Sequence, residues 1–156
     1  PSSVNTEKII SMFFNGEVHI LTSILRVGAP GSHTDTASTG KGYTVGIGLN
    51  GQLNKEGYNI YGERRTSTSS GRMFENVVLC GHDEICSQIK KAHKMLSRFG
   101  IISWDFAVDE NGEPILIEYN LNYPDVMIYQ MNNGPLFGDL TQTVLEDVRE
   151  KLKKER

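Results

Sequence analysis

Short segments in which apolar and polar residues alternate make up much of the chain, and Asn-Gly pairs separate several of them. Alternation with a period of two is typical of a β-strand with one face in the core, and Asn-Gly between two such segments favours a two-residue type I′ hairpin turn. Such pairs stand at Asn15-Gly16, Asn50-Gly51 and Asn111-Gly112. The pattern therefore predicts three hairpins, with strands over residues 8–14 and 17–27, 43–50 and 52–62, and the two halves of 103–120.

The apolar period lengthens to three or four residues in two segments, as in an amphipathic helix. Residues 83–99 carry such a stripe, with Gly100 placed to end the helix, and residues 140–152 carry a second one. The stretch between the third hairpin and the last helix, 121–138, contains two prolines, and we expect it to be irregular. Hairpins, helix, hairpin and helix in this order predict an α+β fold with a mainly antiparallel sheet and two principal helices.

The length of 156 residues predicts a single domain with a core of its own. No run approaches the roughly 18 apolar residues of a membrane span, and the N-terminal residues lack the basic and apolar regions of a signal peptide. The formal charge of −3 gives no electrostatic reason to expect a nucleic-acid partner. We therefore expect a cytoplasmic protein, in which Cys80 and Cys86 are reduced thiols or, alternatively, form a local disulfide.

The third hairpin sets two acids against each other. With Asn111-Gly112 as its turn, Asp105 faces Glu118, and Ser103 faces Asn120 on the same side of the sheet. Opposed like charges on neighbouring strands cost roughly 0.2–1 kcal/mol. Two interpretations remain open: a solvated face on which the acids splay apart, or a site for a hard cation such as Mg²⁺, to which Asn120 adds a neutral oxygen.

The opposite face of this hairpin is apolar. The same register builds it from three cross-strand pairs: Trp104 with Tyr119, Phe106 with Ile117, and Val108 with Ile115. We expect this face to pack inward beneath the helices.

Residues 28–42, rich in Gly, Ser and Thr, have no apolar period and predict a long exposed loop of the kind that often carries function. Lys41 does not complete a phosphate-loop motif, because Asp35 stands where the first glycine is required. A looser anion site with Lys41 as a point charge stays open beside a plain flexible loop. Arg26, just before the loop, is either a surface strand end or an anion clamp over the acids. The four scattered histidines predict no zinc site.

Asp105, Glu118 and Asn120, spaced D-x12-E-x-N across a hairpin, resemble the metal-binding triad of the ATP-grasp superfamily. The chain also resembles one branch, the sugar-transfer-associated ATP-grasp domain of bacterial polysaccharide biosynthesis proteins, in six segments: SVNTEKI at 3–9, LRVG at 25–28, TDTASTGKG at 34–42, ISWDFAV at 102–108, ILIEYN at 115–120 and YQMNNGPLFG at 129–138. The resemblance implies that residues 1–156 form the C-terminal part of such a domain, without the N-terminal lobe that carries the nucleotide-binding lysines.

The resemblance also implies roles for individual residues. Asp105, Glu118 and Asn120 become ligands of Mg²⁺ or Mn²⁺ ions that bridge ATP phosphates, and Arg26 becomes a catalytic contact to a phosphate or acyl phosphate. Arg26 and Lys41 are then the candidate nucleotide-binding residues. Lys8 stands where the branch usually has arginine.

ATP-grasp enzymes in general transfer a phosphoryl group from ATP to a carboxylate and then let a nucleophile attack the acyl phosphate. The resemblance thus implies a ligase-like parent that acts on a carboxylate or sugar-linked substrate in surface polysaccharide assembly. We expect the isolated chain to be inactive and prone to self-association. The alternative is a non-catalytic nucleotide- or glycan-binding module that keeps the fold, which the altered loop residues Thr36 and Lys41 favour.

Overall fold

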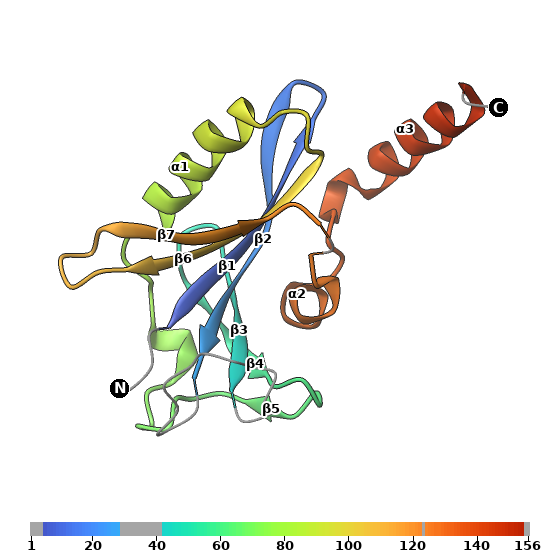
Figure 1. The fold of residues 1–156 in the computed structure, drawn as a ribbon. Coiled ribbons are helices and arrows are strands. Elements are labelled where there is room, and N and C mark those ends of the chain that lie inside the picture. The colour runs from blue at the N-terminus through green and yellow to red at the C-terminus, as the bar shows by residue number, and fades with distance from the viewer. Residues whose placement is uncertain (1–4, 29–41, 123, 155–156) are drawn as a thin grey trace.

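Seven strands form one antiparallel sheet, in the order β5-β4-β3-β2-β1-β6-β7 (Figure 1). The computed structural model describes residues 5–28, 42–122 and 124–154. Its strands are β1 Thr6–Phe14, β2 Glu17–Val27, β3 Tyr43–Ile47, β4 Leu53–Tyr58, β5 Arg64–Arg65, β6 Ile101–Val108 and β7 Pro114–Asn120. The helices are α1 His82–Met95, α2 Val126–Asn133 and α3 Thr141–Lys154, with short 3-10 turns η2 Phe74–Asn76 and η3 Gly138–Leu140. The α+β class and the antiparallel sheet are confirmed.

The neighbouring residues Ile9 and Ile10 on the central strand β1 point to opposite faces of the sheet, and each begins a separate core. Ile9 packs against Ile85 and Ile89 of α1 and against the buried side of β6. Ile10 packs with Ile24 and with Tyr129 of α2. Helices α1 and α2 therefore cover opposite faces, as Figure 1 shows.

Helix α1 ends four residues before the predicted limit of Phe99. Met95 is its last residue, and the N–H of Leu96 donates to the carbonyl oxygens of Ala92 and His93. The His93 ring then binds the Phe99 carbonyl oxygen at 2.8 Å, which directs the chain away from the helix axis toward β6. The apolar stripe remains continuous across this break, because Leu96 and Phe99 still pack on the same core.

The first hairpin has the predicted turn. Phe14 pairs with Glu17, and both central residues have positive φ angles, 51° at Asn15 and 84° at Gly16, as a type I′ turn requires. Asn tolerates this left-handed conformation better than other residues with a side chain.

The third hairpin does not have a type I′ turn. The Asp109 N–H donates to the Glu113 carbonyl oxygen at 3.0 Å, which makes the loop one residue longer than predicted. The Asp109 carboxylate accepts the backbone N–H groups of Asn111 and Glu113, both at 2.8 Å. This side chain therefore stabilises a loop in which Gly112, at φ 86°, takes the left-handed conformation and Asn111 does not.

A β-bulge then restores the predicted pairing of the acids. Phe106 faces Leu116 whereas Asp105 faces Glu118, so Ile117 is an extra residue on β7. The predicted partners of Phe106 and Val108 are wrong. The pairs beyond the bulge are confirmed: Ser103 with Asn120, Trp104 with Tyr119, and Asp105 with Glu118.

The apolar face of this hairpin is only half buried. Trp104 and Phe106 on β6 lie beneath α1, but Ile117 is 52% exposed and Tyr119 is 47% exposed. The prediction that all four pack inward is wrong for the two residues on β7, because α1 packs over β1 and β6 and leaves the edge strand open.

Helix α2 replaces part of the stretch expected to be irregular. The Asp125 side chain accepts the Met127 N–H at the N-terminus of the helix, and Gly134 follows its last residue with φ 80°. The short apolar face, Ile128 and Tyr129, is buried against the sheet.

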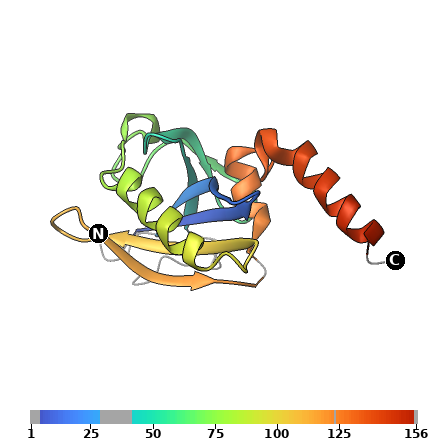
Figure 2. The same cartoon turned by 90° about the horizontal axis from the view of Figure 1, so that it is seen from above.

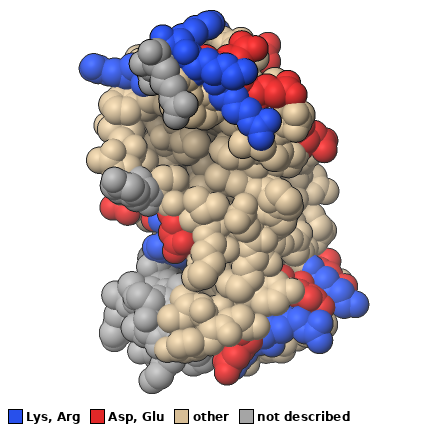
Figure 3. Space-filling model, turned by 90° about the vertical axis from the view of Figure 1, so that its right-hand side faces the viewer, with Lys and Arg blue, Asp and Glu red and all other residues tan. Residues whose placement is uncertain are grey.

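Helix α3 projects away from the sheet (Figure 2). Val144 is its buried residue, whereas Leu145, Val148 and Leu152 are 44%, 45% and 56% exposed. Figure 3 views the molecule from the right-hand side of Figure 1. On this face, charged side chains gather at the two ends of the molecule, with α3 at the upper end, and a mostly uncharged surface lies between. Within the described residues, no helix has the length and apolar character that crossing a bilayer needs.

Candidate metal and phosphate site

Asp105 is the buried centre of the predicted site. Its backbone lies in the middle of β6, and the residue is 3% exposed. Both carboxylate oxygens bind the Nζ of Lys8, at 2.6 and 2.9 Å, because Lys8 is directly opposite on β1. A buried carboxylate needs such a partner, since an unpaired charge in the interior is strongly destabilising.

Arg26 approaches the same carboxylate from β2. Its Nη2 lies 3.7 Å from the second oxygen of Asp105, and its Nε donates to the Thr6 hydroxyl at 3.1 Å. Thr6 faces Arg26 in the register of β1 and β2, so this contact holds the guanidinium over the polar face of the sheet. The structure therefore brings Arg26 next to Asp105, while its role as an anion clamp stays a prediction.

Glu118 and Asn120 complete the polar row on β7. Glu118 lies opposite Asp105, and the Asn120 side-chain amide donates a hydrogen bond of 3.3 Å to the Glu118 carboxylate. Both residues are exposed, in contrast to Asp105. The row thus runs from two cations, through a buried carboxylate, to an exposed carboxylate and an amide at the sheet edge.

Helix α2 bounds the site along the sheet. The Tyr129 hydroxyl lies 3.2 Å from the hydroxyl of Ser103, which is two residues from Asp105 on the same strand face. Burial raises the pKa of Tyr129, so its hydroxyl keeps its proton. The Asn132 side chain donates to the Thr44 hydroxyl at 2.7 Å and ties the helix to β3.

Lys41 and nearly all of the loop 28–42 lie outside the described residues, so their predicted role stays a prediction. Within the described part of the chain, no three His, Cys, Asp or Glu side chains are grouped to hold a metal ion. The predicted triad has only two such side chains, with an amide as its third member.

Lys8 is the residue whose place in the site the sequence did not predict. In the sequence it differs only from the arginine usual at this position, yet in the structure its Nζ lies 2.6 Å from a carboxylate oxygen of Asp105. Strand alternation was a usable signal, because it places Lys8 on the face opposite Glu7 and Ile9. Its partner on β6 depends on the order of strands in the sheet.

A comparison of this chain with known protein families gives a match. Residues 1–145 match the family described as sugar-transfer associated ATP-grasp. The chain belongs to this family. No curated protein and no solved structure matches it. Membership supports an ATP-grasp-type function, in which an ATP-binding, ligase-like domain generally uses ATP together with Mg²⁺.

The residues on the polar row fit a magnesium ion by their chemistry. Mg²⁺ takes one or two protein carboxylates and fills its remaining positions with water or phosphate oxygens. Asp105 and Glu118 supply two carboxylates on adjacent strands, and the amide oxygen of Asn120 is a further neutral donor. Lys8 already pairs with Asp105, so a divalent cation at this place would compete with its ammonium group.

Proposed function

We propose that this chain forms the Mg²⁺-bearing side of the ATP site in a carboxylate-activating, ligase-like enzyme of bacterial surface polysaccharide biosynthesis, which works in the cytoplasm. Asp105, Glu118 and Asn120 are the proposed metal ligands. Arg26 is the proposed catalytic contact to the transferred phosphate, and Lys41 a second nucleotide contact. The pairing of Asp105 with Glu118 across β6 and β7, beside two cations, is the observation that carries this proposal.

The arrangement of charges suits phosphoryl transfer, in which the protein mainly positions its reactants and stabilises charge. When bound, Mg²⁺ supplies positive charge to the phosphate oxygens as charge develops on them. Arg26 presents a planar guanidinium that matches phosphate in a bidentate manner. The Thr6 hydroxyl accepts a hydrogen bond from the Arg26 Nε, which holds the guanidinium over the polar face of the sheet, next to Asp105.

Lys8 has a positioning role in this proposal. It pairs with Asp105 and holds this side chain in place within the sheet, and its ammonium lies next to the proposed metal position. The side chain is 14% exposed, so it has a path to solvent or to a phosphate oxygen when a metal ion takes its place.

Divalent binding tests the proposal directly. The affinity for Mn²⁺ is measured by calorimetric titration with and without a non-hydrolysable ATP analogue. It should fall at least about tenfold in Glu118→Gln, and further in the double variant Asp105→Asn with Glu118→Gln. Glu110→Gln with Glu113→Gln, two acids in the loop of the same hairpin, is the matched control and should bind normally. Equal binding by the double variant and the native chain would place the metal elsewhere.

The substrates and the lobe opposite this site are also part of the proposal. We propose ATP and a carboxylate or sugar-linked molecule as substrates, and a second, N-terminal lobe that closes on the nucleotide. The 156-residue chain should then hydrolyse ATP at least about 10²-fold more slowly than a longer protein that includes this lobe, since ~1 Å of misplacement already costs about that much. Equal rates would favour a nucleotide site wholly within this chain.

The open edge of the sheet supports self-association of the isolated chain. Four apolar residues of β7 are between 45% and 52% exposed: Ile115, Leu116, Ile117 and Tyr119. A long apolar edge strand readily pairs with another chain. Concentration-dependent sedimentation should show dimers or larger species, and Ile117→Lys should weaken them.

A further inference from the structure

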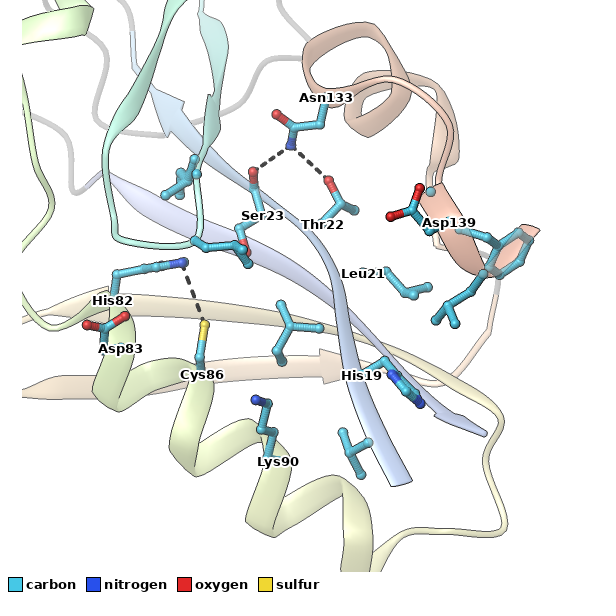
Figure 4. A pocket seen from close by; sticks show the side chains of 18 of the residues that line it. His19, Leu21, Thr22, Ser23, His82, Asp83, Cys86, Lys90, Asn133 and Asp139 are labelled. Atoms are coloured by element: carbon cyan, nitrogen blue, oxygen red, sulfur yellow. Dashed lines mark hydrogen bonds between the residues drawn. The ribbon is translucent and has the colours of Figure 1, made fainter. Parts of the chain in front are cut away.

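A second polar site lies on the α1 face of the sheet, away from the Asp105 row. A cavity of about 1040 Å³ opens between α1, strand β2 and the segment around η3. Helix α1 contributes His82, Asp83, Cys86 and Lys90 to its lining, and Figure 4 shows their side chains on one side of it. Lys8 and Asp105 do not line this cavity.

Cys86, His82 and Glu7 form a chain of contacts at one end of the cavity. Cys86 follows His82 by four residues on α1, so the two side chains share a helix face, and the Sγ lies 3.6 Å from the His82 Nε2. The other ring nitrogen, Nδ1, lies 2.7 Å from a carboxylate oxygen of Glu7 on β1. A thiol, an imidazole and a carboxylate in this order are the parts of an activated nucleophile: an attacking atom, the imidazole that activates it and the group that orients the imidazole.

Burial distinguishes the contacts among Cys86, His82 and Glu7 from a chance surface contact. His82 and Glu7 are each 3% exposed, so neither side chain swings freely in solvent. Gly51 packs closely beside the base of this side chain, because a Cβ placed there would lie 3.3 Å from the His82 Cβ. Cys86 is partly exposed and lines the cavity, so a small molecule can reach its sulfur.

The charges around His82 favour its protonated form. Burial by itself lowers the pKa of His82, but hydrogen bonds and charge from Cys86 and Glu7 raise it to about 10. Other titratable groups line the cavity near these three residues. They are Asp83 and Lys90 on α1, Glu17 and His19 on β2, and Asp139 on η3. Protonated His82 therefore places a positive charge beside the Cys86 sulfur, which lies 3.6 Å from its Nε2.

We propose that Cys86 is a nucleophilic thiol that forms mixed disulfides with small disulfide molecules entering the cavity, with protonated His82 as the charge that stabilises its thiolate and Glu7 as the residue that positions His82. In this step the thiol proton passes to water. The sulfur electron pair forms a bond to one sulfur of the disulfide, whose S–S bond breaks and leaves its electron pair on the other sulfur. That sulfur takes a proton from water, so one thiol and one disulfide give a new disulfide and a released thiol.

The chain contains its own control thiol. Cys80 is exposed and lies just before α1, and no histidine contact to it is described. An ordinary thiol with a pKa near 8.5 is only about 1% thiolate two pH units lower, so it reacts slowly there. At pH 6.5 we expect bis(2-hydroxyethyl) disulfide to modify Cys86 at least about tenfold faster than Cys80, and at pH 8.5 we expect a smaller ratio. Both rates come from one sample, by mass spectrometry of the peptides.

Variants separate activation from simple access. His82→Gln and Glu7→Gln should each slow the modification of Cys86 several-fold at pH 6.5 and leave the rate at Cys80 unchanged. His19→Gln, which changes another histidine of the cavity, should alter neither rate. In urea the two cysteines should react alike. If native Cys86 reacts no faster than Cys80 at pH 6.5, the proposal is wrong, and this comparison decides even if a variant fails to fold.

Discussion

Lys8 lies directly opposite Asp105 in the register of β1 and β6, and its Nζ is 2.6 Å from one carboxylate oxygen and 2.9 Å from the other. The repulsion between the facing acids Asp105 and Glu118 is therefore offset by an ammonium group within the protein itself. A metal ion at the same carboxylate would have to compete with this ammonium, so a change of Lys8 should change the measured affinity for divalent cations.

Lys8→Gln should raise the affinity for Mn²⁺ or Mg²⁺. The variant frees Asp105 and removes a positive charge beside the proposed ion; a hydrogen bond to a charged group contributes about 1.5–3 kcal/mol, so a gain of about tenfold is expected. The same change should lower the free energy of unfolding without metal, because Asp105 loses its buried partner. Calorimetric titration measures the first effect and urea denaturation the second.

Lys55→Gln is the matched control for this experiment. Lys55 also pairs with a carboxylate, Glu75, but at 4.0 Å and with a side chain that is 66% exposed. Metal affinity and stability should both stay near native values, as for most surface ion pairs. A gain of affinity in both lysine variants would mean that net charge, and not the Asp105 contact, controls binding.

Two asparagines that precede glycine should respond differently to alanine. Asn15→Ala places a Cβ-bearing residue without a helpful amide at φ 51° and should cost about 1 kcal/mol of stability. Asn111→Ala should cost less, because Asn111 is not left-handed and its backbone N–H still donates to Asp109. Thermal or urea denaturation of the two variants measures the difference, and an equal loss at both sites would contradict the turn assignments.

Gly46→Ala should loosen helix α2. A Cβ at Gly46 would lie 2.0 Å from the Asn133 Oδ1 and 2.2 Å from the Asn54 Nδ2, which hydrogen bond to each other at 3.0 Å. Forced repacking of this kind costs about 1–3 kcal/mol. Gly100→Ala is the control, since its Cβ would have no atom within 4 Å. Urea unfolding should separate the two, and similar stability for both variants would show that α2 shifts freely.

Stability should fall from neutral to alkaline pH through His82. Burial alone lowers its pKa, but Cys86 and Glu7 raise it from 6.5 to about 10 in the folded protein. The stabilisation is then fully present below pH 6.5 and is lost as the pH rises toward 10. Unfolding free energies measured from pH 6 to 10 should decline less steeply in Glu7→Gln, and the same slope in His19→Gln as in the native chain is the control.

Local sequence patterns determined much of this protein. Period-two alternation and Asn-Gly pairs located the strands of three hairpins, and the longer apolar period located α1 and α3, because these signals depend on residues a few positions apart. The facing of Asp105 and Glu118 was also predicted, although an unpredicted loop residue and the bulge at Ile117 cancel to produce it. Asp125 before the helix and Gly134 after it were signals for α2, masked by the prolines on either side.

Tertiary structure alone decided which side chains meet across the sheet. Lys8 and Asp105 are 97 residues apart, and Glu7 and His82 are 75 apart. Alternation assigns Glu7 and Lys8 to opposite faces, but their partners follow from the insertion of β1 between β2 and β6 and from the packing of α1 over it. That arrangement is set by burial of whole apolar faces, so no local pattern encodes the buried ion pairs that it brings together.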